Sequence, residues 1–189
     1  MRFPIARLML PAALAIAGQI LIAPAFADQK DPILPELFER LMKAPSPGEA
    51  QEIDALIWHV WLKAGSPELD TLMAQGSEAM DNGEYATAMT DFNKIIAARP
   101  DFAEGWNKRA TLYYLMEDYK NSLADIDKTL ALEPRHFGAL SGLGLVNIKL
   151  EKYEEAVKAY QRVLAVDPQN AGAKANLDVV NDLIKKKSI

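Results

Sequence analysis

The sequence predicts an all-α protein built from stacked helix–turn–helix repeats. Three prolines, Pro100, Pro134 and Pro168, follow one another at intervals of 34 residues. Between them, apolar residues recur at the three- and four-residue spacing of amphipathic helices, and no stretch shows the alternation typical of a β-strand. A repeat of this length holds one pair of helices, which buries its apolar face by stacking on its neighbours.

The chain begins with a segment of the kind that directs export. Arg2 and Arg7 are the only charged residues before Asp28, residues 8–22 form an apolar run, and residues 25–27 read Ala-Phe-Ala. This arrangement is typical of a secretory signal peptide. We expect residues 1–27 to be cleaved after Ala27, which would place the mature protein in the periplasm. The alternative is an uncleaved membrane anchor, which would need roughly 20 apolar residues.

The overall charge is acidic, and this limits the classes of partner. The net charge is −5, and it would become −7 without residues 1–27, which hold two arginines and no acidic residue. An acidic protein is poorly suited to nucleic acid or to an anionic membrane. The sequence contains no cysteine, so packing alone must stabilise an exported fold. No low-complexity linker interrupts the rest of the chain, and one domain is expected.

Residues 28–66 are predicted to form an N-terminal capping helical hairpin. Apolar residues at the spacing of a helix predict a short first helix over 36–43. Ser46, followed by a proline and then by a glutamate three residues after the serine, is the signature of a capped helix start. The second helix is expected to end at Gly65.

Two tryptophans in this hairpin allow two interpretations. When the 34-residue register is extended backwards, Trp58 and Trp61 fall at apolar positions of a second helix. We therefore expect the hairpin to cover the exposed face of the first repeat, with both rings in the core. In the alternative, the tryptophans and His59 anchor a ligand or partner, because tryptophan combines a large apolar surface with a polar N–H.

Residues 67–170 hold the three repeats, 69–102, 103–136 and 137–170. In each repeat a tyrosine opens the second helix, a small residue follows three positions later, and a large apolar residue comes four positions after that. The first helices carry a large residue followed by a small one, which lets two helices approach closely. The equivalent residues are Tyr85, Tyr119 and Tyr153; Ala88, Ser122 and Ala156; Phe92, Ile126 and Tyr160; Leu72, Trp106 and Leu140; and Gly76, Ala110 and Gly144.

The same register predicts where the helices begin and end. The six repeat helices are expected at 67–81 and 84–98, 102–116 and 119–132, and 136–150 and 153–166, with turns at Gly83, Glu117 and Glu151. Residues 171–189 are predicted to form a C-terminal capping helix. Its start is capped by Asn170, it runs to about Lys186, and its apolar stripe is Leu177, Val180 and Ile184.

The equivalent positions of the three repeats closely resemble the tetratricopeptide repeat family. Most of them match the family's pattern of large, Leu-Gly, Tyr, Ala, aromatic and Pro residues. The resemblance implies a right-handed α/α superhelix. Gln75 and Arg109 stand where the family usually has leucine, and Ala79 and Asn147 stand where it favours an aromatic residue. We therefore expect repeats one and two to pack less tightly along that seam.

Arg109 would lie on the packed side of its helix, where a buried guanidinium must be paired. One interpretation is an ion pair with a neighbouring helix, through Asp91 or Asp127. The other is a charge that reaches into a groove for an anionic ligand. Carboxylate pairs such as Asp125 and Asp127 are expected to be solvated surface residues.

The resemblance also implies where a partner would bind. In tetratricopeptide proteins the first helices of successive repeats line a concave groove for extended peptides or partner helices. Chaperone-binding members of the family hold a C-terminal carboxylate with several lysine, arginine and asparagine residues, a set called the carboxylate clamp. Only Asn107 and Lys108 match that set, so the clamp is expected to be absent. The groove residues implied are Met73, Ser77, Met80, Asn107, Lys108, Thr111, Tyr114, Leu145 and Ile148.

No motif in the sequence indicates catalysis, a cofactor or a metal. The two histidines, His59 and His136, lie in different units, and a zinc site would need three or four ligands. Glycines at 138, 142 and 144 fall inside a helical pattern, unlike a phosphate-binding loop. The leading hypothesis is therefore a non-enzymatic adaptor of the bacterial cell envelope that binds another protein in the concave groove. The alternative is a structural subunit that self-associates as a homo-oligomer or completes an envelope complex.

Overall fold

The computed structural model describes residues 28–187, and this part of the chain forms nine α-helices and no strand. The predicted signal peptide, residues 1–27, lies outside the described residues. All six predicted repeat helices begin and end within one residue of the observed bounds. The helices are α1 (Leu34–Lys43), α2 (Pro47–Trp61), α3 (Pro67–Asp81), α4 (Tyr85–Ala98), α5 (Ala103–Leu115), α6 (Tyr119–Leu132), α7 (Phe137–Lys149), α8 (Tyr153–Val166) and α9 (Ala171–Lys187).

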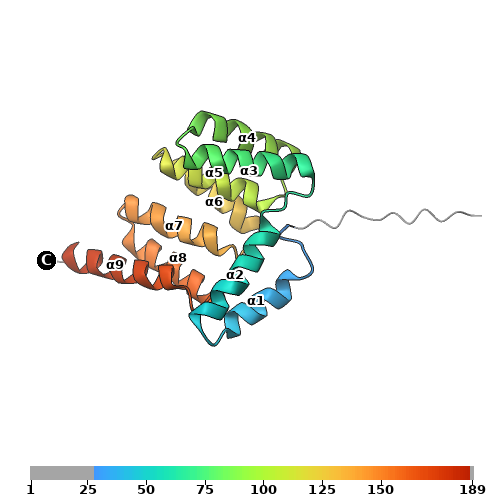
Figure 1. The fold of residues 1–189 in the computed structure, drawn as a ribbon. Helices are drawn as coiled ribbons and strands as arrows, with labels where there is room; N and C mark the ends of the chain where they lie inside the picture. The colour runs from blue at the N-terminus through green and yellow to red at the C-terminus, as the bar shows by residue number, and fades with distance from the viewer. Residues whose placement is uncertain (1–27, 188–189) are drawn as a thin grey trace, which may run out of the picture.

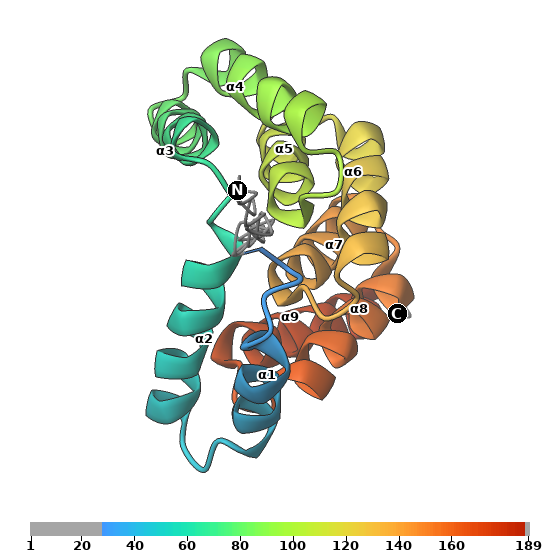
Figure 2. The ribbon, with the colours of Figure 1, turned by 90° about the vertical axis from the view of Figure 1, so that its right-hand side faces the viewer.

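Helices α3 to α8 form three pairs, and each pair packs against the next (Figure 1). Figure 2 shows that the pairs follow a curved path, with α3, α5 and α7 on its inner side and α4, α6 and α8 on its outer side. The predicted all-α superhelix is confirmed. Its inner face is formed by the first helices of the three repeats.

The local sequence sets the helix starts and the turns between paired helices. The side-chain oxygens of Ser46 and Ser66 accept hydrogen bonds from backbone N–H groups three residues later, at 3.3 Å in both cases. The three turns use one equivalent position with a positive φ: 79° at Gly83, 59° at Glu117 and 55° at Glu151. Glycine adopts this conformation freely, whereas an L-residue with a side chain is strained by about 1–2 kcal/mol.

Within each pair, a small residue on the first helix faces a large one on the second. A Cβ atom added to Gly144 would lie 2.4 Å from Cζ of Tyr160, and one added to Gly76 would lie 2.8 Å from Cε1 of Phe92. In repeat two the alanine at this position, Ala110, shares a buried cluster with the smaller Ile126. The size of one side chain therefore compensates for the size of the other.

The prediction that the hairpin α1–α2 covers repeat one is wrong. Its buried residues belong to one cluster with residues of α7, α8 and α9, and α1 packs directly against α8. Figure 2 shows α2 running from the end of the curve near α1 toward α3. The hairpin therefore packs on the repeat farthest from it in sequence, with α9 at the same end of the array.

Repeat one does not need a cap because the surface at its end of the array is polar. Gln75, which replaces the usual leucine, is exposed, and it lines a surface hollow with Glu78, Asn82, Glu84 and Thr87. An apolar hairpin would find no apolar surface there. The departure at Gln75 thus marks the solvated end of the array.

Helix α9 closes the other end as predicted. Asn170 accepts a hydrogen bond from the backbone N–H of Ala173 at 2.9 Å, and Val180 is fully buried. Leu177 and Ile184 pack against the same cluster as the hairpin. Within residues 28–187, none of the helices has the length and apolar character needed to cross a membrane.

Candidate functional site

A pocket of about 50 Å³, here called the concave pocket, opens on the inner face between α5 and α7. Its walls are mainly apolar, and its polar groups belong to the side chains of Asn107, Thr111, Tyr114 and Ser122. Thr111 is exposed, and its hydroxyl donates a hydrogen bond to the backbone oxygen of Asn107 at 3.0 Å. The complete lining is Asn107, Ala110, Thr111, Tyr114, Ser122, Ile126, Gly142 and Leu145.

The pocket brings together four of the nine predicted groove residues: Asn107, Thr111, Tyr114 and Leu145. The other five lie outside its lining, and two of them are in the core. Met73 is 3% exposed and Met80 is 8% exposed, within a cluster that also contains Ala64 and Phe92. The expectation that these methionines are exposed in the groove is wrong, because both belong to a buried cluster with residues of α4 and α5, among them Phe92 and Leu112. Ser77, Lys108 and Ile148 lie apart from the pocket.

Four lining residues are outside the predicted groove set, and three of them are Ala110, Ser122 and Ile126. These three occupy repeat positions that are predicted to pack between paired helices. In repeat two these positions hold Ala, Ser and Ile, and across the pocket Gly142 adds no side chain. The hollow therefore lies where several small side chains meet, which is a signal present in the sequence.

A buried polar network runs from the pocket to the start of α7. Asn107 donates a hydrogen bond from Nδ2 to Oε2 of Glu104 at 2.9 Å, and the same oxygen lies 3.0 Å from Nε2 of His136. Nδ1 of His136 accepts from the backbone N–H of Ala139 at 3.1 Å, so the proton is on Nε2, which donates to Glu104. The network is enclosed, since Glu104 is 1% exposed and His136 is 0% exposed.

Glu104 also engages the two side chains of the inner face that could bind a ligand's carboxylate. Nζ of Lys108 lies 3.8 Å from Oε1 of Glu104, and Asn107 donates to the other carboxylate oxygen. The two residues that resemble a carboxylate clamp are thus both directed to a carboxylate within the chain.

The tryptophans of α2 pack on the start of α7, where Trp61 is buried and Trp58 is partly buried. The Trp61 ring stacks on the His136 ring, with centroids 4.1 Å apart and planes 8° from parallel. Trp58 meets the edge of Phe137 at 5.4 Å, and a Cβ atom on Gly138 would lie 2.6 Å from Cη2 of Trp58. We call His136, Phe137 and Gly138 the aromatic seat. His59 is exposed and points away from this cluster, beside Lys63 and Asp70.

Arg109 forms an ion pair, as one interpretation expected, but its partner is Asp125. Nε and Nη2 donate to the two oxygens of that carboxylate at 2.7 and 2.9 Å, and Nη1 donates to Asn93 at 2.6 Å. The guanidinium lies 5.0 Å from the ring of Trp106. The expectation of a solvated Asp125 is wrong, because α6 turns this residue toward α5 and leaves it 4% exposed.

Two acidic residues, Asp54 and Asp167, line one hollow between α2 and the loop before α9. Oδ1 of Asp54 is buried, and it has no hydrogen-bond partner among the described residues. Burial, reinforced by the charge of Asp167, raises the pKa of Asp54 to about 7. Among residues 28–187 no three side chains of the His, Cys, Asp or Glu type come together as a metal site would require.

Comparison with known proteins identifies the repeats. Tetratricopeptide repeat models match residues 73–124 and 138–170. A TPR repeat-containing protein of Rhizobium etli is 33% identical over 87 residues, which are 46% of this chain and 43% of the relative. The chain thus matches less than half the length of that relative.

Solved structures share the architecture. The first TPR of Spaghetti (RPAP3) bound to the HSP90 peptide SRMEEVD is 26% identical, with a TM-score of 0.59 over 62% of this chain and 93% of that chain. The first TPR domain of human RPAP3 is 27% identical, with a TM-score of 0.61 over 64% and 94% of the two chains. The Sgt2 TPR domain from Aspergillus fumigatus, 23% identical, has a TM-score of 0.61 over 65% and 83% of the two chains. Residues 73–124 and 138–170 are therefore tetratricopeptide repeats.

Proposed function

We propose that this protein is a non-enzymatic adaptor that binds a segment of another protein in the concave pocket. The observation that carries the proposal is the pocket itself, which has mainly apolar walls formed by α5, α6 and α7 and includes the exposed Thr111 in its lining. The similar RPAP3 domain was solved with an HSP90 peptide, which supports a peptide as the kind of ligand. A site of this size suits one apolar side chain, with the exposed Thr111 beside it.

The chemistry of this pocket differs from that needed for an acidic peptide. The peptide bound to the RPAP3 domain, SRMEEVD, is acidic at its end. Here Asn107 and Lys108 both face Glu104, and the whole chain carries a net charge of −5. Like charges disfavour association. We therefore propose a neutral or basic segment that places one aliphatic side chain in the pocket.

The proposed location is the periplasm, and it is supported by the composition of residues 1–27. N-terminal sequencing of the protein recovered from the periplasmic fraction tests it directly. A mature chain beginning at Asp28 is expected. Recovery of the uncleaved chain in the membrane fraction would contradict it.

Site-specific crosslinking in the cell tests the binding site. A photo-crosslinking amino acid replaces Thr111 in the pocket or, as the matched control, Thr90 on the outer helix α4. Both threonines are exposed, and both donate a hydrogen bond to the backbone oxygen four residues earlier. We expect one defined adduct from position 111 and none from position 90. Equal adducts from both positions would contradict the proposal. Adducts with a second copy only would also contradict it, and they would favour self-association.

A further inference from the structure

The hairpin α1–α2 is joined to repeat one in sequence, yet it packs on repeat three. Ile53, Ile57 and Trp61 of α2 are each at most 1% exposed, in the same cluster as Phe137 and Leu140 of α7. Its contact with α7 is made on the aromatic seat, at the beginning of an inner helix. Helix α2 therefore covers the start of α7, which is one of the inner helices that line the concave groove.

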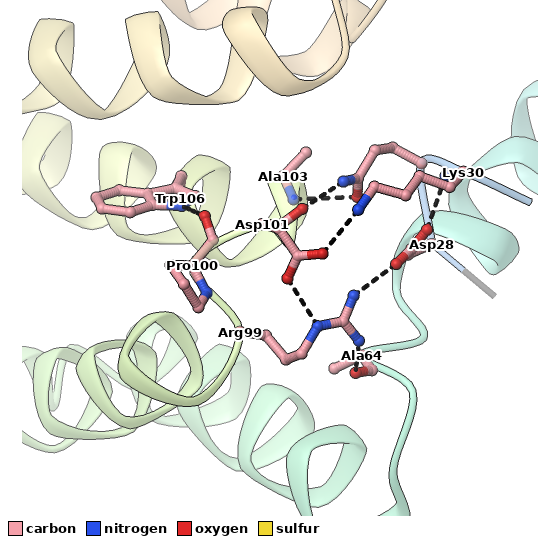
Figure 3. A network of polar contacts seen from close by, with 9 residues as sticks. Asp28, Lys30, Ala64, Arg99, Pro100, Asp101, Ala103 and Trp106 are labelled. Atoms are coloured by element: carbon pink, nitrogen blue, oxygen red, sulfur yellow. Dashed lines mark hydrogen bonds and ion pairs between the residues drawn. The ribbon is translucent and has the colours of Figure 1, made fainter. Parts of the chain in front are cut away.

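A second attachment holds the segment that leads into the hairpin. Asp28 is 0% exposed, and its carboxylate accepts a hydrogen bond from Nη2 of Arg99 at 2.7 Å (Figure 3). Arg99 also donates to the carboxylate of Asp101 at 2.9 Å and to the backbone oxygen of Ala64 at 3.0 Å. One guanidinium therefore ties together the start of the described chain, the end of the hairpin and the loop between repeats one and two.

The two residues after Asp28 are also bound to that loop. Oε1 of Gln29 accepts the backbone N–H of Ala103 at 3.2 Å, and its Nε2 donates to the backbone oxygen of Asp101. Ala103 is the first residue of α5, whose own N-cap residue supplies no side-chain bond, so Gln29 caps this helix from a distance. Nζ of Lys30 pairs with the Asp101 carboxylate at 2.7 Å. We call residues 28–30 the N-terminal latch.

We propose that α2 is a built-in ligand on a helix-binding surface, held in place by the N-terminal latch. A partner that offers an amphipathic helix with two large aromatic side chains three positions apart takes its place on the aromatic seat. This inference rests on the proposed function of protein binding, and it names a class of partner. The loop at 62–66, which contains Gly65 at a φ of 87°, joins the hairpin to repeat one and is the hinge that this proposal requires.

The aromatic seat and the concave pocket belong to one continuous surface. Gly142 of the pocket lies one helical turn after Gly138 of the seat on α7. The hydrogen bonds from His136 through Glu104 to Asn107 join them underneath. A partner segment that enters the pocket and continues along α7 therefore reaches the position of Trp58.

Binding of a synthetic α2 peptide tests this proposal with the full protein. The peptide spans residues 47–61, and its control carries alanine in place of both tryptophans. The latch is weakened by Asp28→Ala, and the matched variant Lys43→Ala removes an ion pair with Glu39 on the same hairpin whose side chains are 71% and 66% exposed. Opening the hairpin raises the fraction of molecules able to bind the peptide, and the apparent affinity rises in proportion.

We expect the peptide to bind the Asp28→Ala variant at least tenfold more tightly than the parent or the Lys43→Ala variant. The control peptide should bind none of them. Hydrogen exchange should increase over 34–61 in Asp28→Ala and stay unchanged over 119–132, which makes no contact with the latch. Equal affinities for the three proteins, or unchanged exchange in the hairpin, would overturn the proposal.

Gln29→Ala gives an independent route if Asp28→Ala does not fold. It removes two hydrogen bonds of the latch and leaves the Arg99 network in place, and the same order of affinities is expected. An unchanged affinity in this variant would also overturn the proposal. The experiment uses no natural partner and changes no residue of the concave pocket, so its failure leaves the proposed function of the pocket standing.

Discussion

Replacing Gly144 with alanine tests the rule that shapes each repeat, namely that a small residue on one helix compensates for a large one on the next. The new Cβ atom would lie 2.4, 2.7 and 2.8 Å from three ring atoms of Tyr160, where carbon atoms normally approach to about 3.5–4.0 Å. Tyr160 is 0% exposed, so its ring has little room to move. Overpacking costs about 1–3 kcal/mol, and alanine regains up to about 1 kcal/mol as the better helix former. The expected net loss is about 1–2 kcal/mol.

The partner residue decides the sign of this effect. In a Tyr160→Ile background, which reproduces the Ala110 and Ile126 combination of repeat two, Gly144→Ala should stabilise the protein by up to about 1 kcal/mol. Tyr160→Phe is the matched control, because it keeps the ring and removes only a buried hydroxyl that has no hydrogen-bond partner in the described structure. Urea unfolding followed by circular dichroism gives the free energies. An equal loss in the Tyr160→Ile and Tyr160→Phe backgrounds would refute the reasoning.

Three further substitutions test the electrostatics and the turns, each by urea unfolding. Arg109→Leu should cost about 3 kcal/mol because it leaves the Asp125 carboxylate buried and unpaired, whereas changing both residues to leucine should restore stability; unchanged stability in the single variant would contradict the ion pair. The pKa of Asp54 is raised to about 7, so the folded state favours the protonated carboxyl and the free energy of unfolding should fall as pH rises from about 4 to 7. Asp54→Asn should flatten this slope. A parent protein without the slope would refute the assignment. Glu151→Gly should stabilise by about 0.5–1 kcal/mol, and a loss would show that the turn is unstrained.

The repeat helices could be predicted closely because their signals are local. The 34-residue spacing of Pro100, Pro134 and Pro168 fixes the register, and Ser66 with the proline that follows fixes the first start. Each helix pair is stabilised mainly by contacts within one unit and with the next, so a pattern read along the chain contains most of the necessary information.

The position of the hairpin could not be predicted because it depends on complementarity between distant residues. The register placed Trp58 beside repeat one, whereas the room for its ring is made by Gly138, 80 residues later. Gln75 marks the polar end of repeat one, whereas the sequence pattern predicts from it a loose contact between repeats one and two. Packing between helices also explains the site. Met73 and Met80 belong to a buried cluster with Phe92 and Leu112, while the concave pocket is lined by residues of repeats two and three.

The most direct test of the account is the affinity of the purified protein for the partner segment identified by crosslinking at position 111. Leu145→Lys places a charge in the concave pocket, and Leu150→Lys places the same charge on an exposed leucine at the end of α7, outside the pocket. After circular dichroism confirms that both variants fold, we expect Leu145→Lys to weaken binding at least tenfold and Leu150→Lys to leave it unchanged. Equal binding by the two variants would contradict the assignment of the concave pocket as the binding site.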